Sequence, residues 1–331
     1  MKRDVYFDSL KFFLIFTVVY GHVLTIDYEV GSVNRAIRNF IYLFHMPLFI
    51  FISGRFSQIR DRKKYGGGIL RLFETYVVFQ IIHIFSRYFM HKGNFELEHM
   101  LVIPEMAMWY LLCLIYWRLM VLYILPKPIN DGKKVEVYII LLSFIISLFA
   151  GFVPLSRELS FQRAFAFLPF FIMGYYSASV DIKKRLTILP FWSCLLVIIA
   201  IFTIFCSYFK GSYNFLYYAF PYNDAYDLWM RMVCICSAVF CSLLIMRLVI
   251  PLYRVASWGK CTLFIYMYHL FLEAVLKIVI VKGFLPTGII PIFIYSVAIT
   301  MFLIWAYRFD VLNVIMNPIS YLISRKSKKL L

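Results

Sequence analysis

The chain has 331 residues, of which 63% are hydrophobic, 20% are aromatic and only 15% are charged. Its mean hydropathy of +0.81 excludes an ordinary soluble domain, in which about half of the residues are apolar. The formal net charge of +17 does not indicate nucleic-acid binding, because the basic residues are scattered over short loops between apolar segments. The composition predicts an all-α polytopic membrane protein, with a single integral-membrane domain over residues 1–331.

Apolar runs of about twenty residues, the length that crosses a bilayer, divide the chain into ten predicted transmembrane helices. They cover roughly residues 8–26, 38–56, 69–90, 106–125, 135–151, 162–180, 187–208, 227–249, 259–281 and 288–308. With a cytoplasmic N-terminus, 23 of the 34 Lys and Arg residues fall on the inner side and ten on the outer side. This bias predicts that the N- and C-termini are both cytoplasmic.

A lysine and a histidine interrupt the first predicted helix. Lys11 and His22 are eleven residues apart, which at about 100° per residue is about 20° more than three full turns. Both side chains therefore project from one face, about 16 Å apart along the axis. Ionisable groups inside a membrane are costly unless they face a cavity or the protein interior, so this face is a candidate functional site. The alternative is structural: Lys11 reaches the cytoplasmic interface and His22 bonds a neighbouring helix.

Two further histidines and a carboxylate lie in apolar segments. His45 lies near the outer end of the second predicted helix, where it is expected either to face His22 across the hairpin or to pack beside the kink at Pro47. In the ninth predicted helix, His269 and Glu273 are four residues apart and hence adjacent on one face. The carboxylate is expected to orient an imidazole for acid–base chemistry, to relay protons, or to form an inert pair.

A basic cluster precedes the third predicted helix, which Arg71 begins after the sequence Gly66-Gly67-Gly68. We expect this glycine-rich segment to be a flexible inner loop. The cluster could hold a polyanionic nucleotide, although cytoplasmic loops are commonly basic in any case. Glu74 follows Arg71 by three residues and is placed to pair with it. The other basic residues of the cluster are Arg60, Arg62, Lys63 and Lys64.

Other chemistries find no support in the sequence. The seven cysteines lie almost entirely in apolar segments, with no Cys-x-x-Cys and no Cys/His spacing typical of zinc, so we expect small core residues and no metal site. There is no Gly-x-Ser-x-Gly, Walker loop or Gly-x-Gly-x-x-Gly context, which gives no support to serine-hydrolase, NTPase or dinucleotide chemistry.

Together, these residues resemble the membrane-bound acyltransferase 3 family, particularly its fucose 4-O-acetylase-like branch. That family is marked by a basic residue, ten residues and a histidine in the first helix, here Lys11 and His22, with Lys in place of the commoner Arg. The segment Phe44-His-Met-Pro-Leu-Phe-Ile-Phe-Ile-Ser-Gly54 is similar too. Shorter similarities are Arg71-Leu72, Trp109-Tyr110-Leu111, Arg163 before Phe167-Leu-Pro-Phe-Phe-Ile-Met-Gly174, and Tyr268-His269-Leu270.

The resemblance implies O-acylation, usually O-acetylation, of a cell-surface glycan or its lipid-linked precursor, with acetyl-CoA or another acyl-CoA as co-substrate and no permanently bound cofactor. It implies a multi-pass protein of the bacterial inner (cytoplasmic) membrane. His22 would act as general base, or as an acyl-histidine intermediate, while Lys11 would hold the donor. Assisting acyl-CoA residues are Arg71, Arg60, Arg62, Lys63 and Lys64; supporting residues are His45, Trp109, Arg163, His269 and Glu273.

Two other classes of function stay open on the sequence alone. A proton-coupled transporter or flippase of a polar or lipid-linked substrate would use His22, His45 and the pair His269 and Glu273 as a proton path. A membrane scaffold would use none of them for chemistry. Consumption of acetyl-CoA with release of free thiol distinguishes an acyltransferase from both.

Overall fold

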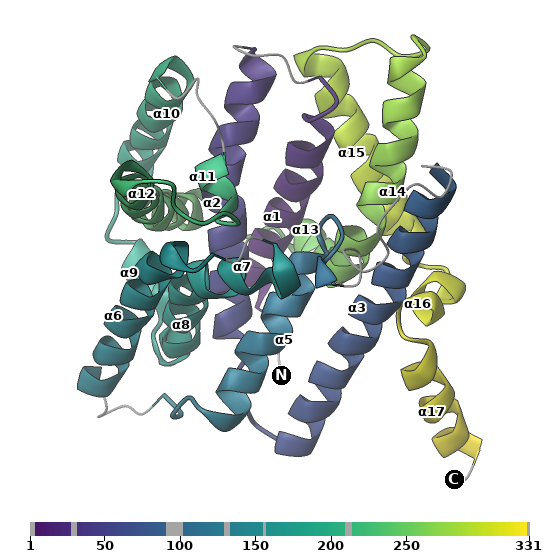
Figure 1. Cartoon of the computed structure of the whole chain (residues 1–331), viewed down its shortest axis with the longest axis horizontal. Helices are drawn as coiled ribbons and strands as arrows, with labels where there is room; N and C mark the ends of the chain where they lie inside the picture. Colours follow the sequence, from purple (N-terminus) through teal and green to yellow (C-terminus); the bar gives the residue numbers. More distant parts are fainter. Residues whose placement is uncertain are drawn as a thin grey trace. The chain divides into compact units, whose positions relative to one another are not determined.

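The computed structural model describes residues 4–27, 32–90, 102–128, 133–154, 157–208 and 214–329, and the regular elements within these ranges are all helical (Figure 1). Seven of the described helices are long and apolar enough to cross a membrane. Two shorter apolar helices, Met108–Tyr123 and Phe191–Ser207, occupy further predicted spans. The predicted fold class, an all-α polytopic membrane protein, is confirmed.

The chain forms two compact units, each built from separate stretches of sequence. Unit 1 comprises Met1–Phe56, Phe170–Tyr218 and Tyr222–Trp305, and unit 2 comprises Ser57–Pro169, Ala219–Pro221 and Ala306–Leu331. The helices of unit 1 are α1 (Val5–Val23), α2 (Val33–Arg55), most of α8 (Leu168–Tyr176), α9 (Ile182–Leu186), α10 (Phe191–Tyr208), α11 (Asn214–Tyr217), α12 (Ala225–Leu248), α13 (Tyr253–Trp258), α14 (Thr262–Val281) and α15 (Ile289–Ala306). Those of unit 2 are α3 (Arg62–Met90), α5 (Met108–Tyr123), α6 (Lys133–Phe149), α7 (Phe161–Ala166), α16 (Asp310–Met316) and α17 (Pro318–Lys329).

Helix α1 is the core helix of unit 1. It begins after Asp4, whose carboxylate accepts a hydrogen bond from the backbone N–H of Tyr6 (3.1 Å), a usual N-cap contact. The helix packs against α2, α13 and α14, and Leu10, Leu14 and Ile15 are completely buried. The polar side chains of Asp8, Ser9 and Thr17 are buried as well and so face protein instead of lipid, which is the condition under which polar groups are tolerated in a membrane.

Helices α2 and α8 cross at two glycines. A Cβ atom on Gly54 would collide with the backbone carbonyl oxygen of Phe171, and one on Gly174 would collide with that of Phe51. The two backbones are therefore in direct contact, a mode of packing that small residues make possible in membrane helices. This crossing joins the His45 segment to the Gly174 segment, the two longest motifs of the sequence analysis, inside unit 1.

The start of α3 corrects one sequence expectation. Asp61 accepts hydrogen bonds from the backbone N–H groups of Lys63 (2.9 Å) and Lys64 (3.1 Å), as an N-cap does, and the helix runs from Arg62. The sequence Gly66-Gly67-Gly68 thus lies inside a helix, so the prediction of a flexible loop there was wrong. Once a capped first turn has formed, the modest helix penalty of glycine, about 1 kcal/mol per residue, is outweighed by the packing of a long apolar helix.

The sixth predicted span, residues 162–180, is not one continuous helix. Helix α7 ends at Ala166 and α8 begins at Leu168, with Pro169 in the first turn of α8, where its missing N–H costs nothing. The chain enters α7 through Leu159 and Ser160, which both have positive φ angles (44° and 56°). A sharp reversal of this kind requires the left-handed region, which non-glycine residues rarely adopt.

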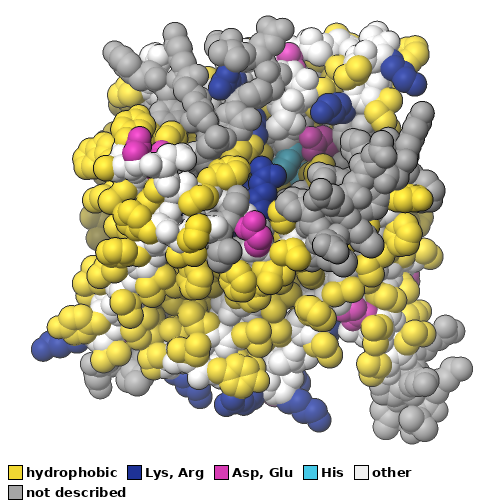
Figure 2. All heavy atoms as spheres, in the orientation of Figure 1, with side chains coloured by type: hydrophobic (Ala, Val, Ile, Leu, Met, Phe, Trp, Pro, Cys, Tyr) yellow, Lys and Arg dark blue, Asp and Glu magenta, His cyan; other side chains and the backbone are white. Residues whose placement is uncertain are grey.

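Large apolar side chains cover much of the molecular face drawn in Figure 2. Examples from helices predicted to span the membrane are Leu142 of α6 (54% exposed), Leu196 of α10 (68%) and Ile290 of α15 (72%). In water, such surfaces would drive association. Around a membrane protein they face lipid tails, which agrees with the multi-pass assignment.

Candidate active site

His22 and Glu273 bring α1 and α14 together in unit 1. The Nδ1 atom of His22 lies 3.8 Å from Oε2 of Glu273, and the two side chains are 26% and 12% exposed. The hydroxyl group of Thr25 lies 3.2 Å from the other carboxylate oxygen of Glu273 and 2.7 Å from the backbone oxygen of His22. The carboxylate of Glu273, on α14, is therefore also bound by Thr25, just after α1, and it faces the imidazole of His22.

A second imidazole lies against the first. The ring of His269 is 5.1 Å from that of His22 between centroids, in an edge-on arrangement, and is only 1% exposed. Its Nδ1 atom lies within hydrogen-bond distance of the backbone oxygens of Ile265 (3.1 Å) and Tyr266 (2.9 Å), so this nitrogen carries the proton. The buried His269 thus forms a wall of the site, while the partly exposed His22 is the imidazole that a substrate can reach.

Tyr42 links the third histidine to this group. Its ring lies 4.8 Å from that of His45 and 6.3 Å from that of His22. His45 is buried, and its Nδ1–H donates to the backbone oxygen of Ile41 (2.7 Å), within the turn that precedes Pro47. The ring of Tyr42 thus lies against both imidazoles, and His45 itself is a packed histidine beside Pro47, as the second of the two expectations had it.

A buried arginine completes the group. Arg38, 4% exposed, donates from Nη2 to the hydroxyl oxygen of Tyr217 (2.5 Å) and lies over the ring of Tyr42, 4.3 Å from its centroid. The rings of Tyr42 and Tyr217 are themselves 5.6 Å apart. A guanidinium group is only weakly hydrated and stacks on aromatic faces, so it can keep its charge when it is buried among rings. Among the described residues, the group therefore includes the cation of Arg38, the carboxylate of Glu273 and three imidazoles.

Sequence reasoning had missed Arg38, Tyr42 and Tyr217 as site residues. Arg38 had counted only toward topology, although Arg38, Tyr42 and His45 are spaced i, i+4 and i+7 and so share one helix face. That spacing was a usable signal. Tyr217 belongs to α11, in a segment where sequence pattern gives no contact information, so only the folded chain identifies it.

The loops near this site are fastened by Asp27. One of its carboxylate oxygens accepts hydrogen bonds from the side-chain amide of Asn34 (2.8 Å) and from the backbone N–H of Gly288 (2.8 Å). Gly288 has a φ angle of 115°, a conformation that side chains other than glycine's rarely permit. This contact ties the chain after α1 to the start of α2 and to the approach to α15, and so fixes Thr25 and its neighbours.

Lys11 lies on the same helix as His22 but has its own partners. Its Nζ atom is 3.3 Å from a carboxylate oxygen of Asp8, and it lies 4.2 Å from the ring centroid of Phe56 at the end of α2. With 27% of the side chain exposed, the ammonium group is neither buried nor fully solvated. It thus lies over Phe56 and beside one carboxylate.

The basic cluster predicted to bind acyl-CoA belongs to unit 2. Arg71 and the four residues around the start of α3 are exposed. Lys64 pairs with Asp61 (3.9 Å), and Arg62 lies 5.7 Å from the ring of Tyr123. Arg60 and Lys63 are the remaining two residues of the basic cluster around the start of α3. Their exposure is consistent with either a nucleotide-binding surface or a topogenic loop.

Glu74 has a structural role different from the pairing with Arg71 considered above. Its carboxylate accepts hydrogen bonds from the backbone N–H groups of Ile319 and Ser320 and from the hydroxyl group of Ser320 (2.6 Å). These N–H groups belong to the first turn of α17, where no helical partner exists for them. Glu74 therefore fastens α17 to α3 within unit 2.

Trp109 and Arg163, the remaining candidates, do come together in unit 2. The guanidinium carbon of Arg163 lies 4.8 Å from the ring centroid of Trp109, and Phe167 stacks on the same tryptophan at 5.3 Å. The indole is therefore contacted by a cation and an aromatic ring. Within the described ranges, no three His, Cys, Asp or Glu side chains are arranged to hold a metal ion.

Comparison with known proteins gives one match that bears on chemistry. Residues 4–308 match a protein family described as an acyltransferase domain, so the match covers nearly the whole chain and both units. No curated protein and no solved structure matches the chain.

Proposed function

This chain belongs to the membrane-bound acyltransferase 3 family, and from that premise we propose that it moves the acetyl group of acetyl-CoA to a hydroxyl group of a cell-surface glycan or of its lipid-linked precursor. Family membership establishes a multi-pass membrane acyltransferase. The acetyl donor, the glycan acceptor, the fucose 4-O-acetylase-like branch and the bacterial inner membrane are the proposed part. The sequence motifs at His22 and His45 support it.

The observation that carries the proposal is the contact between His22 and Glu273. A general base must be reachable by substrate and oriented by a neighbouring group, and the partly exposed His22 with its carboxylate neighbour has both properties. The separation of 3.8 Å is longer than a hydrogen bond, as is common in catalytic pairs without substrate. With a proton on Nδ1, directed toward the carboxylate, Nε2 is left as the proton acceptor.

The proposed step follows from this arrangement. Nε2 of His22 takes the proton of the acceptor hydroxyl while its oxygen attacks the carbonyl carbon of the thioester. When the tetrahedral intermediate collapses, the C–S bond breaks and the thiolate of CoA takes the proton back from the imidazolium. Glu273 stabilises the imidazolium in between, and the fixed charge of Arg38 faces the same group of rings. An acyl-histidine intermediate is the second form of the mechanism.

We propose that the acyl donor contacts Lys11 while its thioester lies near His22. The two side chains lie on one face of α1, about 16 Å apart along the helix, so an extended donor can touch both. Lys11 would bind a phosphate or orient the donor, and the exposed cluster in unit 2 (Arg71 first, then Arg60, Arg62, Lys63 and Lys64) would assist with the nucleotide. His45, His269, Trp109 and Arg163 remain proposed supporting residues.

The test is release of free CoA thiol from acetyl-CoA by the purified protein, in the presence of a glycan acceptor from the same cells. We expect turnover by the unmodified chain and a loss of about 10² to 10⁴-fold for His22→Ala, the usual cost of removing a positioned base. His83→Asn is the matched control, because it alters a buried histidine of α3 that is not among the candidates. Mass spectrometry of surface glycans, with and without the gene, identifies the acceptor by the loss of an acetyl group.

Two results would contradict the proposal. Near-normal turnover of His22→Ala would remove His22 from the mechanism while leaving the family assignment intact. Absence of thiol release with every acyl-CoA and glycan tried, together with proton-coupled movement of a substrate across vesicles, would favour the transporter alternative.

A further inference from the structure

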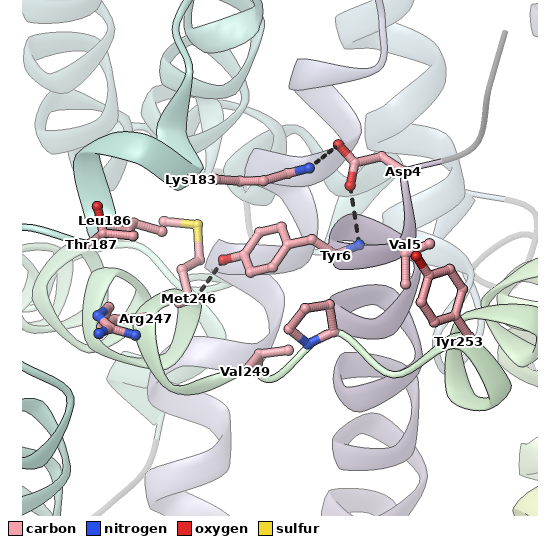
Figure 3. Close-up of a pocket in the computed structure, with 11 residues that line it drawn as sticks. Asp4, Val5, Tyr6, Lys183, Leu186, Thr187, Met246, Arg247, Val249 and Tyr253 are labelled. Atoms are coloured by element: carbon pink, nitrogen blue, oxygen red, sulfur yellow. Dashed lines mark hydrogen bonds and ion pairs between the residues drawn. The ribbon is translucent and has the colours of Figure 1, made fainter.

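Unit 1 contains a pocket of about 630 Å³ at the N-terminal end of α1 (Figure 3), and no histidine is among the described residues that line it. Three segments far apart in sequence form it: the start of α1, the α9 region and the connection from α12 to α13. Its volume lies in the usual range for small-molecule sites. Since Lys183 belongs to a loop that the positive-inside pattern places in the cytoplasm, the pocket is on the cytoplasmic side.

The pocket is held in shape by hydrogen bonds between these segments. The hydroxyl group of Tyr6 donates to the backbone oxygen of Met246 (2.5 Å), which joins α1 to α12. Arg247 donates from Nε to the backbone oxygen of Leu189 (2.7 Å), which joins α12 to the chain after α9. The walls are thus fixed by contacts that do not involve any ligand.

Lys183 and Arg247 are cations that line this pocket, and they have different partners within the protein. Lys183 forms an ion pair with Asp4 at 2.7 Å, and the side chains are 48% and 31% exposed. Among the described residues, the guanidinium group of Arg247 is hydrogen-bonded through Nε alone. The described lining residues include one acid and two bases and so carry a net positive charge, and the two amino groups of Arg247 are available as donors.

Apart from these charges the lining is mainly apolar, with Tyr253 at the edge, 83% exposed. An apolar pocket with a planar ring and two cations suits a ligand that has phosphate groups joined to a less polar part. A guanidinium group is well suited to phosphate, because its donors match two phosphate oxygens at once. Figure 3 shows the ammonium group of Lys183 directed toward Asp4 and Arg247 on the other side of the Tyr6 ring, so a ligand that engages both cations has to extend across the pocket.

We propose that this pocket binds a phosphate-bearing ligand through Arg247 and Lys183, and that Asp4 competes with the ligand for Lys183. A partly exposed ion pair contributes little stability, so an incoming phosphate can displace the Asp4 carboxylate. The ligand is either a soluble nucleotide or the headgroup of an anionic phospholipid, since both present phosphate at this side of the membrane. The proposal does not depend on the acyl-transfer mechanism, because phosphate binding at this pocket is measured without turnover.

The experiment uses the full chain in nanodiscs and four variants. Arg247→Gln removes the guanidinium group, and Lys183→Gln removes the ammonium group that pairs with Asp4. Asp4→Asn removes the competing charge but keeps the cap on α1, because asparagine caps helices as well as aspartate does. Lys184→Gln is the matched control, since Lys184 is in the same short helix as Lys183 but does not line the pocket.

Two probes distinguish the sources of phosphate. In neutral phosphatidylcholine nanodiscs, binding of adenosine 3′,5′-bisphosphate is measured by calorimetry. In nanodiscs containing phosphatidylglycerol, the number of retained phosphatidylglycerol molecules is measured by native mass spectrometry. We expect one of the probes to bind about tenfold more weakly to Arg247→Gln and more weakly to Lys183→Gln, with no change for Lys184→Gln.

The decisive variant is Asp4→Asn, which should bind the same probe about two- to fivefold more tightly. Misfolding cannot produce such a gain, so this variant keeps the test valid even if Arg247→Gln folds poorly. A response of either probe supports the pocket and identifies its source of phosphate. If Asp4→Asn and Arg247→Gln leave both probes unchanged relative to Lys184→Gln, the proposal is overturned.

Discussion

The imidazole of His22 and the carboxylate of Glu273 lie 3.8 Å apart, on two helices that are far from one another in sequence. An imidazole in a membrane core needs a partner that fixes its orientation, and a carboxylate supplies one through the nitrogen that faces it. The hydroxyl group of Thr25 holds the carboxylate from the other side. The three groups therefore form a chain from α14 to the end of α1.

The first prediction concerns this carboxylate. Glu273→Gln keeps the size of the side chain but removes its charge, so it should lower kcat by about 10²-fold without a matching change in KM, because the imidazolium is then no longer stabilised. Thr25→Val, which removes one hydrogen bond to the carboxylate, should have a smaller effect in the same direction. Steady-state thiol release at saturating acetyl-CoA measures both.

Lys282→Gln is the control for this series. Lys282 is the C-cap residue of α14, so this variant removes a charge at the end of the helix and leaves the carboxylate of Glu273 unchanged. A Glu273→Gln variant with the kcat of Lys282→Gln would show that the contact with His22 has only a structural role.

Much of this site could be predicted from residue type, but its pairing could not. A histidine and a carboxylate inside apolar helices are conspicuous in any sequence, and the i, i+4 rule connects Glu273 to His269 because both lie on one helix. The contact with His22 depends on how α1 packs against α14, and sequence spacing carries no information on that. For the same reason, the contact of Arg38 with Tyr217 could only be found in the folded chain.

The errors in the fold have local causes. The three glycines after Tyr65 indicated a loop because glycine disfavours helix, yet Asp61 caps the helix that contains them. Residues 162–180 had the composition of one span, but the helix is interrupted at Phe167, between α7 and α8, and hydropathy does not register such an interruption. Apolar length predicted the helices well, and breaks within them poorly.

The second prediction uses the crossing of α2 and α8. Gly54→Ala and Gly174→Ala should each lower the thermal midpoint of the purified protein, at a cost of about 1–3 kcal/mol, because the new methyl group meets backbone instead of a movable side chain. Gly66→Ala is the control, since no atom lies within 4 Å of its Cβ position. It should raise stability by about 0.5–1 kcal/mol, the gain of alanine over glycine inside a helix. Equal midpoints for Gly54→Ala and Gly66→Ala would contradict the close crossing.

The third prediction separates two roles for Lys11. If its ammonium group binds the donor, Lys11→Arg should keep part of the activity and Lys11→Gln very little, because the charge is retained only in the first. If Lys11 only neutralises Asp8, the double variant Lys11→Gln with Asp8→Asn should restore activity, since neither charge is then left unpaired. We expect no such recovery. The measurement is KM for acetyl-CoA and kcat in the unmodified chain and the three variants; full recovery in the double variant would assign Lys11 a structural role.

The last prediction concerns the nucleotide of the donor. Arg71 is exposed on α3, and Glu74, the carboxylate one turn away, is engaged with α17. The guanidinium group of Arg71 is therefore accessible to a phosphate ligand. Arg71→Gln should raise KM for acetyl-CoA several-fold, with a smaller change in KM for the acceptor and little change in kcat, because the interaction lost is with a non-reacting part of the donor.

Lys184→Gln is the control for Arg71→Gln, because it removes a predicted cytoplasmic charge at a residue that does not line the pocket beside Tyr6. The informative comparison is with Arg247→Gln in unit 1. If Arg71→Gln left KM for acetyl-CoA unchanged while Arg247→Gln raised it, the donor nucleotide would occupy the pocket beside Tyr6, and the cluster at the start of α3 would serve only to orient the chain in the membrane. If Arg71→Gln alone raised KM, the pocket would be available to a phospholipid headgroup, because the donor would then be held by unit 2.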